Sequence, residues 1–158
     1  MNTRAATCAI ARLRQMDLAD LGTVCEIEKT AYSHPWTSGN FEDSLRSGYW
    51  AQVLIGVDQA VWGYVVAMPG VEETHLLNLT VTPSRQGQGW ARFMLDELVA
   101  WSRRQQAHQV WLEVRVSNGR ARRLYVAYGF DHVGERKNYY PGLGRQRENA
   151  VVMRLTLA

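Results

Sequence analysis

The chain has 158 residues, is 46% hydrophobic and carries a formal net charge of +3 at pH 7. This length corresponds to about one domain, and the six Trp and seven Tyr residues favour a globular protein over a disordered one. No apolar run approaches the ~20 residues that a membrane span needs, and arginines interrupt the first 14 residues where an export signal would need an apolar core. We therefore expect no membrane partner and a cytoplasmic location.

Two cysteines, Cys8 and Cys25, occur without a CxxC motif and without a histidine at metal-ligand spacing. This usage is typical of a reducing compartment, and it predicts no structural zinc and no other metal. Cys25 falls on an apolar helical stripe, where a small core residue is a simpler interpretation than a nucleophile. The positive charge rests almost wholly on arginine, which suits an anionic ligand or a ribosomal setting and requires neither.

Hydrophobic periodicity divides the chain into strands and helices without a repeat, a low-complexity tract or a linker. Ile10 and Leu13 are expected to face inward from the first strand, and Asp17 is expected to cap a helix whose apolar face includes Leu18. The predicted strands are 9–14, 49–57, 60–68, 72–81, 109–116, 130–135 and 148–157, and the other predicted helices are 38–47, 90–104 and 118–128, with a loop at 138–144. We expect one mixed α/β domain over residues 1–158, with helices on both faces of a central sheet.

The segment 81–92 has the pattern of a phosphate-binding turn. The predicted strand ends at Val81, the chain turns and passes through Gly87 and Gly89, and helical spacing begins at Trp90. Glycines allow the backbone to approach a ligand closely, and the first N–H groups of a helix, together with its dipole, favour an anion. Two glycines also occur in ordinary strand-to-helix turns, so the loop alone does not identify such a site.

Glu113 interrupts the most regular predicted strand, between Leu112 and Val114. Burial raises the pKa of a carboxyl group unless a partner stabilises the charge. The simple explanation is an ion pair with Arg115 on the same face, and the functional one is a general base. Tyr125 lies on the inward stripe of the following helix, where it is either core packing or, since a buried hydroxyl needs a partner, a second group facing the same cleft.

These residues bring out a family resemblance. The run Gln86-Gly87-Gln88-Gly89-Trp90-Ala91 fits the acyl-CoA loop pattern Gln/Arg-x-x-Gly-x-Gly/Ala of the GNAT-family N-acetyltransferases, three residues after Pro83. More specific blocks resemble the RimI type of this family, bacterial enzymes that acetylate the N-terminal alanine of small-subunit ribosomal protein eighteen: 77–81, 111–118, 124–130 and 136–141, together with Pro35-Trp36. The resemblance spans about residues 10–155 and implies the GNAT fold, a mixed, mostly antiparallel sheet of about seven strands.

The resemblance implies roles by position. Glu113 matches the proton acceptor and Tyr125 the proton donor of a direct transfer in a ternary complex. The strand Leu79, Thr80 and Val81 would hold the pantetheine arm of acetyl-CoA, and the remaining cofactor residues would be Gly87, Gln88, Gly89, Trp90, Ala91, Arg92 and Asn118. Ala91 replaces the more usual final glycine, which a first helical turn does not require.

The expected substrate is the N-terminal peptide of a small-subunit ribosomal protein, with Trp36, Tyr139 and Tyr140 as walls of a peptide groove. Trp36 is equally well explained as packing under the first helix. A GNAT enzyme acting on other protein N-termini or on small amines remains an alternative. A non-catalytic acetyl-CoA or RNA-binding module is another, because Arg120, Arg122 and Arg123 form a basic cluster. No aromatic platform interleaves that cluster, so we expect a solvated helix face, no direct nucleic-acid contact and a monomer.

Overall fold

The structure is a computed structural model that describes residues 10–158, so Cys8 and Ala9 lie outside the described part of the chain. Its described residues fall into two compact units, one of residues 10–68 and 78–98 and the other of Pro69–Leu77 and Val99–Ala158. Seven described strands are hydrogen-bonded in the order β1-β2-β3-β4-β5-β7-β6. β4 pairs with β5 in parallel, and the other registered pairs are antiparallel. The expected mixed, mostly antiparallel sheet is confirmed.

A capped turn joins the first strand to the first long helix of the first unit. Strand β1 (Ala11–Gln15) leads through a 3-10 turn, η1 (Leu18–Asp20), into helix α2 (Leu21–Ala31). The Asp17 carboxylate accepts a hydrogen bond from the Ala19 N–H, and the Asp20 carboxylate accepts one from the Asp17 N–H, which makes a capping box. The predicted cap at Asp17 is confirmed, although it begins a 3-10 turn.

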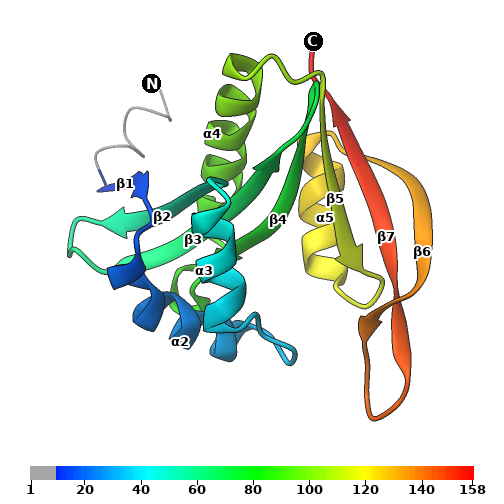
Figure 1. The fold of residues 1–158 in the computed structure, drawn as a ribbon, viewed down its shortest axis with the longest axis horizontal. Helices are drawn as coiled ribbons and strands as arrows, with labels where there is room; N and C mark the ends of the chain where they lie inside the picture. Colours follow the sequence, from blue (N-terminus) through cyan, green and yellow to red (C-terminus); the bar gives the residue numbers. More distant parts are fainter. Residues whose placement is uncertain (1–9) are drawn as a thin grey trace. The chain divides into compact units, whose positions relative to one another are not determined.

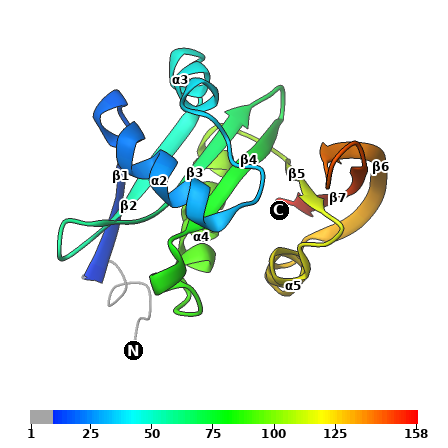
Figure 2. The same ribbon diagram turned by 90° about the horizontal axis from the view of Figure 1, so that it is seen from below.

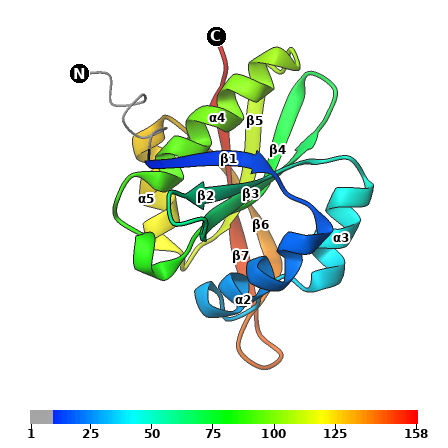
Figure 3. The ribbon, with the colours of Figure 1, turned by 90° about the vertical axis from the view of Figure 1, so that its left-hand side faces the viewer.

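Helices cover both faces of the strands in the first unit. Figure 2 shows α2 and α3 on one side of β2 and β3 and α4 on the other, and Figure 3 shows β1 alongside β2. Tyr64 of β3 packs edge-on against Phe41 of α3 at 5.7 Å between ring centroids. The further elements of this unit are α3 (Ser38–Arg46), β2 (Trp50–Gly56), β3 (Val61–Pro69), the second half of β4 (Glu73–Val81), a 3-10 turn η2 (Pro83–Arg85) and the first part of α4 (Trp90–Arg104).

A bulge in β3 fixes the start of α4. The register passes from Leu54 opposite Gly63 to Ile55 opposite Val61, so Trp62 is the extra residue. Its ring lies over Gly56, where a Cβ atom would come within 2.1 Å of it. The same ring packs against Trp90, the first residue of α4, at 5.4 Å. The Trp62 ring thereby anchors the start of the helix that follows the glycine loop.

The second unit combines a long hairpin with one helix. Figure 1 shows β6 and β7 side by side, and their antiparallel register runs from Asp131 opposite Arg154 to Pro141 opposite Arg147. Its elements are β5 (Gln109–Arg115), α5 (Gly119–Tyr128), β6 (Asp131–Pro141) and β7 (Arg147–Thr156), with the first half of β4 and the end of α4. Among residues 10–158, no helix is both long and apolar enough to cross a membrane.

The predicted loop at 138–144 is wrong in its first half. Strand β6 continues to Pro141, with a register shift between Arg136 and Tyr140 and a positive φ of 53° at Asn138. Arg147 on β7 donates hydrogen bonds to the carbonyls of Asn138 and Tyr139 at 2.8 and 2.9 Å. These bonds hold the irregular stretch in the hairpin, and local sequence signals do not encode them.

Two side chains expected in the core are exposed. Ile10 is 48% exposed, because it precedes β1 and only its carbonyl joins the sheet, by accepting from Val57 N–H at 2.9 Å. Leu18 is 68% exposed, because it lies in the 3-10 turn and not on the face of α2. Ala11 and Met16 occupy the buried positions instead.

The ion pair between Arg14 of β1 and Asp20 of η1 should make the stability of the fold depend on pH. The Arg14 guanidinium bonds both Asp20 oxygens, at 2.7 and 2.8 Å, and this hydrogen bond lowers the pKa of Asp20 despite its burial. A lowered carboxyl pKa stabilises the fold above the unfolded-state pKa, and the contribution is lost as the pH falls through the folded-state value. Asp20→Asn should lower the free energy of unfolding at pH 7 by roughly 1–3 kcal/mol, and the difference should vanish in acid.

Urea unfolding across a pH series measures this difference. Asp43→Asn is the matched control, because Asp43 is 76% exposed and its ion pair with Arg46 is long, at 3.8 Å. An Asp20→Asn deficit that persists unchanged into acid would contradict the assignment.

Candidate active site

The glycine loop of the first unit has the backbone that an anion site requires. Gly87 and Gly89 have φ values of 75° and 88°, in the region that favours glycine. The Phe93 N–H donates to the Gly89 carbonyl at 3.0 Å, which begins the helical hydrogen-bond pattern of α4. The N–H groups of Trp90, Ala91 and Arg92 precede this bond and stand at the positive end of the helix. The loop therefore fits a phosphate group.

The side chains around the loop have structural tasks. The Trp90 indole is only 6% exposed, packs against Trp62 and Phe93, and donates to the Gln88 side-chain oxygen at 3.2 Å. The Gln86 amide donates to the Val81 carbonyl at 3.0 Å and so closes the turn onto the end of β4. Trp90 therefore offers a ligand its backbone N–H and not its ring, a distinction that sequence reasoning did not make.

Gly89 provides a direct test of the loop. Space is open around it, since a Cβ atom would meet nothing within 4 Å. Gly89→Ala should strain a backbone with positive φ by about 1 kcal/mol and place a methyl group where a phosphate would approach. We expect the Kd for acetyl-CoA to rise roughly tenfold or more, which corresponds to about 1.4 kcal/mol, as measured by isothermal titration calorimetry.

Gly48→Ala is the matched control for Gly89→Ala. Gly48 also has a positive φ, of 73°, and open space around it, but it follows α3. The two variants should lose similar stability, and only Gly89→Ala should lose affinity for the cofactor. Equal cofactor affinity in both variants would remove the loop from the binding site.

The strand segment 79–81 is held from α2 by a tyrosine at the end of that helix. The Tyr32 hydroxyl donates to the Leu79 carbonyl at 3.2 Å and shares a hydrogen bond of 2.8 Å with the Thr80 hydroxyl. Burial raises the pKa of Tyr32 to about 12, so the hydroxyl keeps its proton at neutral pH. The segment assigned to the pantetheine arm therefore has a fixed position within the first unit.

Beneath this segment lies a buried carboxylate that sequence reasoning missed. Glu28 is 2% exposed and accepts hydrogen bonds from the Tyr64 hydroxyl at 2.5 Å and from the Asn78 amide at 3.2 Å. Burial, then the Glu28 charge, raises the pKa of Tyr64 well above its ordinary value. Asn78 in turn accepts from the Thr80 hydroxyl at 2.7 Å. The sequence carried one signal of this burial: Glu28 stands seven residues after Leu21 and so lies on the same, buried face of α2.

Trp36 also connects to this network. Its backbone N–H donates to Glu28 at 3.2 Å, and its half-buried ring packs against Phe41 at 5.1 Å between centroids. Trp36 is thus a packing residue, but its ring contacts α3, and its link to the first helix is its backbone N–H. A role of Trp36 in contacting a substrate stays a prediction.

In the second unit, Glu113 pairs with residues other than the expected one. Its Oε2 lies 2.5 Å from His75 Nε2 and its Oε1 lies 3.4 Å from Arg136 Nε, while its side chain is 8% exposed. Arg115 instead bonds the Pro141 carbonyl at 2.6 Å and Glu148 at 3.2 Å. The predicted pair of Glu113 with Arg115 is wrong, because β6 and β7 supply other partners for Arg115.

The environment of Glu113 also reverses the expected direction of its pKa. Burial raises the pKa of Glu113, but the hydrogen bond and charge of His75 and the charge of Arg136 together outweigh burial and leave the pKa below its ordinary value. Glu113 is therefore ionised at neutral pH, without the raised pKa that its place in the strand suggested. His75 is the partner that sequence reasoning missed.

Tyr139 and Tyr140 lie on β6 near Glu113. Their rings meet edge to face at 4.9 Å, and the Arg136 and Arg115 guanidinium groups lie over Tyr139 and Tyr140 at 5.5 and 4.6 Å. Burial, and then the charges that include Glu113, raise the pKa of Tyr140 above its ordinary value. Tyr139 is 42% exposed. The second unit thus brings an aromatic pair close to a carboxylate.

Tyr125 and Asn118 lie on α5. Tyr125 is 8% exposed and packs against Phe130 at 5.5 Å, which agrees with the predicted inward stripe. The Asn118 side-chain oxygen accepts from the Ala121 N–H at 3.2 Å and caps the helix, as predicted, and Gly129 ends it with a φ of 122°. Because the cap uses the oxygen of Asn118, a ligand would be met by its amide nitrogen.

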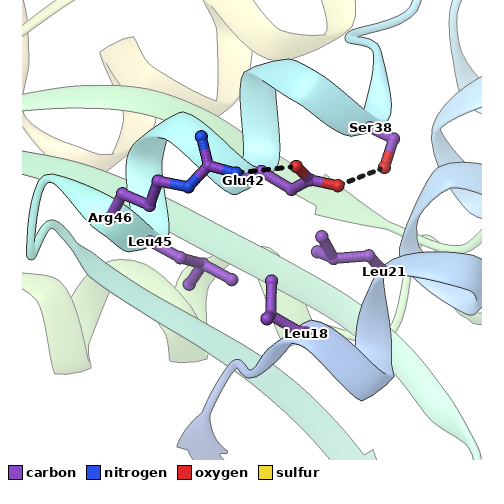
Figure 4. A pocket seen from close by; sticks show the side chains of 6 residues that line it. All are labelled: Leu18, Leu21, Ser38, Glu42, Leu45 and Arg46. Carbon is purple, nitrogen blue, oxygen red and sulfur yellow. Dashed lines mark hydrogen bonds and ion pairs between the residues drawn. The ribbon is translucent and has the colours of Figure 1, made fainter.

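A hollow on the first unit is lined by none of the candidate site residues. Figure 4 shows its apolar floor of Leu18, Leu21 and Leu45, with Glu42 between Ser38 and Arg46 at its rim. These rim groups bond one another at 3.4 Å. The exposed Leu18 side chain lies in this hollow. The polar side chains at the rim are bonded to one another and suggest no chemistry.

The arginine cluster forms part of a second hollow, against β7. Arg122 and Arg123 line it together with apolar groups such as Val126 and Met153, and Arg122 also donates to the Val116 carbonyl at 3.0 Å. Arg122 and Arg123 thus contribute to the packing of α5, and Arg122 also bonds the chain just after β5. Among residues 10–158, no group of His, Cys, Asp and Glu has the arrangement of a metal site.

Comparison with known families assigns the class of protein. A family model described as the acetyltransferase (GNAT) family matches residues 21–130. The match covers more than half of the chain and includes the glycine loop, Glu113 and Tyr125. The protein therefore belongs to the GNAT acetyltransferases, a family of enzymes that take the acetyl group from acetyl-CoA.

Individual relatives are similar along nearly their whole length. The ribosomal protein bS18-alanine N-acetyltransferase of Haemophilus influenzae is 36% identical over 141 residues, which cover 89% of this chain and 95% of that protein. The crystal structure of the ribosomal-protein-S18-alanine N-acetyltransferase from Escherichia coli has a TM-score of 0.85 and 29% identity, over 94% of this chain and 95% of that one. Ard1 from Thermoplasma volcanium, at 24% identity and a TM-score of 0.84, shares the fold.

Proposed function

We propose that this acetyltransferase moves the acetyl group of acetyl-CoA to the α-amine of the N-terminal alanine of small-subunit ribosomal protein bS18. The observation that carries the proposal is the near full-length similarity to relatives that bear this activity in their names, at 36% identity for the Haemophilus influenzae protein. A positive-φ glycine loop at a helix start and an ionised, buried Glu113 support the acetyl-transfer part of the proposal, and the choice of substrate rests on the relatives.

Glu113 is the proposed proton acceptor. An N-terminal amine has a pKa near ~8, so at neutral pH most of it carries a proton that must leave before nitrogen can attack a thioester. The Glu113 carboxylate receives this proton, directly or through one water, and Arg136 and His75 keep it ionised beforehand. Such a group typically contributes about 10²–10⁴-fold to the rate.

Tyr125 is the proposed proton donor. The acetyl group passes from the sulfur of CoA to the amine nitrogen, and the departing thiolate takes the proton of the Tyr125 hydroxyl. No covalent enzyme intermediate is needed, and we propose direct transfer in a ternary complex. Among the described residues Cys25 is the free thiol, and burial raises its pKa, which keeps it in the unreactive thiol form.

Acetyl-CoA would be held through backbone groups. The N–H groups at the start of α4 suit its pyrophosphate, and the segment Leu79, Thr80 and Val81 suits its pantetheine arm. Gly87 and Gly89 have the backbone that a close approach of phosphate needs. Asn118 is the further proposed contact, and Trp36, Tyr139 and Tyr140 are proposed walls for the peptide.

An acetylation assay tests the function. The chain is given acetyl-CoA and a peptide with the Ala-initiated N-terminus of bS18, and tandem mass spectrometry locates the acetyl group. We expect it on the α-amine alone, with no product from the same peptide when its N-terminus is blocked. Turnover of spermidine without turnover of the peptide would instead support the small-amine alternative, and tight cofactor binding without any turnover would support a binding module.

The setting follows from the substrate. A ribosomal-protein substrate and the two-cysteine composition support a cytoplasmic location, and we propose a monomeric, single GNAT domain over residues 1–158, without a metal and without direct contact to nucleic acid. Size-exclusion chromatography with light scattering tests the monomer, and a salt series of RNA binding tests the role of the arginine cluster.

A further inference from the structure

His75 is a titratable residue beside the proposed base to which the proposed mechanism assigns no chemistry. It lies on β4 opposite Trp111 in the parallel pairing with β5, and Glu113 is two residues further along β5 on the same face. This diagonal relation brings Nε2 to 2.5 Å from Glu113 Oε2. The registered pairs of the two strands end at Leu76 opposite Leu112, so Glu113 is the first residue of β5 beyond them.

We propose that His75 is a positioning residue for Glu113, because its Nε2–H donates a hydrogen bond to one oxygen of the Glu113 carboxylate. The inference rests on the proposed function, because it assigns His75 a part in the same proton transfer. Glu113 and not His75 receives the proton of the amine.

The contacts of the pair favour such a role over simple packing. The His75 side chain is 27% exposed and that of Glu113 only 8%, so the histidine is the more accessible member of the pair. The other charged neighbour is Arg136 of β6, at 3.4 Å from Oε1, and Tyr140 of β6 is close enough to feel the charge of Glu113. Arg136 is 57% exposed and its bond is longer, so His75 is the closer orienting contact.

The hydrogen bond matters because it holds the carboxylate of Glu113 in one orientation. A different donor at this position should therefore preserve much of the rate of the chemical step, and a side chain without a donor should not.

Two substitutions separate these effects. His75→Gln keeps an N–H donor near the same place and cannot titrate, whereas His75→Leu removes the donor. We expect His75→Leu to lower kcat roughly 10- to 100-fold, the loss of a hydrogen bond to a charged group, with the KM for acetyl-CoA unchanged. His75→Gln should keep most of the kcat of the wild type, because it keeps a donor to the carboxylate. His108→Gln is the control, since His108 is exposed and should change nothing.

A second measurement works without substrate. Carboxyl ¹³C NMR on glutamate-labelled protein follows the titration of Glu113, and its pKa should rise in His75→Leu, because burial remains while the His75 contribution is lost. An unchanged Glu113 pKa would overturn the inference even if the protein acetylates another substrate. So would Gln and Leu variants with equal kcat. Wild-type turnover of the peptide tests the proposed function separately.

Discussion

Glu113→Gln should lower kcat on the Ala-initiated peptide by roughly 10²–10⁴-fold, the usual contribution of a positioned general base. Glutamine has nearly the shape of glutamate but cannot accept the proton of the ammonium. It also leaves His75 and Arg136, at 2.5 and 3.4 Å, without a negative partner. The affinity for acetyl-CoA should stay close to that of the wild type, because the proposed cofactor contacts lie elsewhere in the chain.

Stopped assays of initial rate and calorimetry of cofactor binding measure the two quantities. Glu135→Gln is the control for charge, because Glu135 is an exposed residue of β6. Tyr125→Phe should also lower kcat, while Tyr128→Phe, one turn further along α5, should not. A kcat of Glu113→Gln within a few-fold of the wild type would remove Glu113 from the proton transfer.

Glu28→Leu should be the most destabilising single change in the first unit. It removes the acceptor for the Tyr64 hydroxyl, the Asn78 amide and the Trp36 N–H, and leaves these donors buried or half-buried without a partner. Each orphaned donor costs about 1–3 kcal/mol, so we expect a loss of roughly 3–5 kcal/mol. For a chain of this size, this corresponds to a fall in Tm of about 10 °C or more.

Differential scanning calorimetry measures the loss. Glu26→Leu is the matched control on the same helix, because the Glu26 side chain is 76% exposed and its ion pair with Lys29 is a surface pair. Glu28→Gln should be milder, since an amide retains one oxygen acceptor. A Tm for Glu28→Leu equal to that of the control would mean that the network contributes little to the fold.

Elements whose signals are local could be predicted from the sequence. Helix α4 begins and ends at the predicted residues because Gly89 precedes it and the apolar spacing continues to its last turn. The cap at Asn118 and the stop at Gly129 were likewise predictable, since each depends on the residue itself.

The partners of charged residues could not be predicted in this way. Glu113 has a like-positioned arginine two residues along its own strand, yet its partners come from β4 and β6, which lie 38 and 23 residues away in sequence. Glutamate is usually a surface residue, and the burial of Glu28 is favourable only because its carboxylate accepts hydrogen bonds from β3 and β4. Pairing across a sheet depends on register, which the pattern of a single strand does not contain.

The tyrosines that contact the segment 79–81 and its network give this strand a support that does not depend on charge. Burial holds the Tyr32 hydroxyl in its protonated form up to a pH of about 12, and the Tyr64 hydroxyl is held likewise. Neutral donors of this kind keep their protons on either side of neutral pH, so Tyr32 holds the backbone of the proposed pantetheine strand in the same place throughout that range.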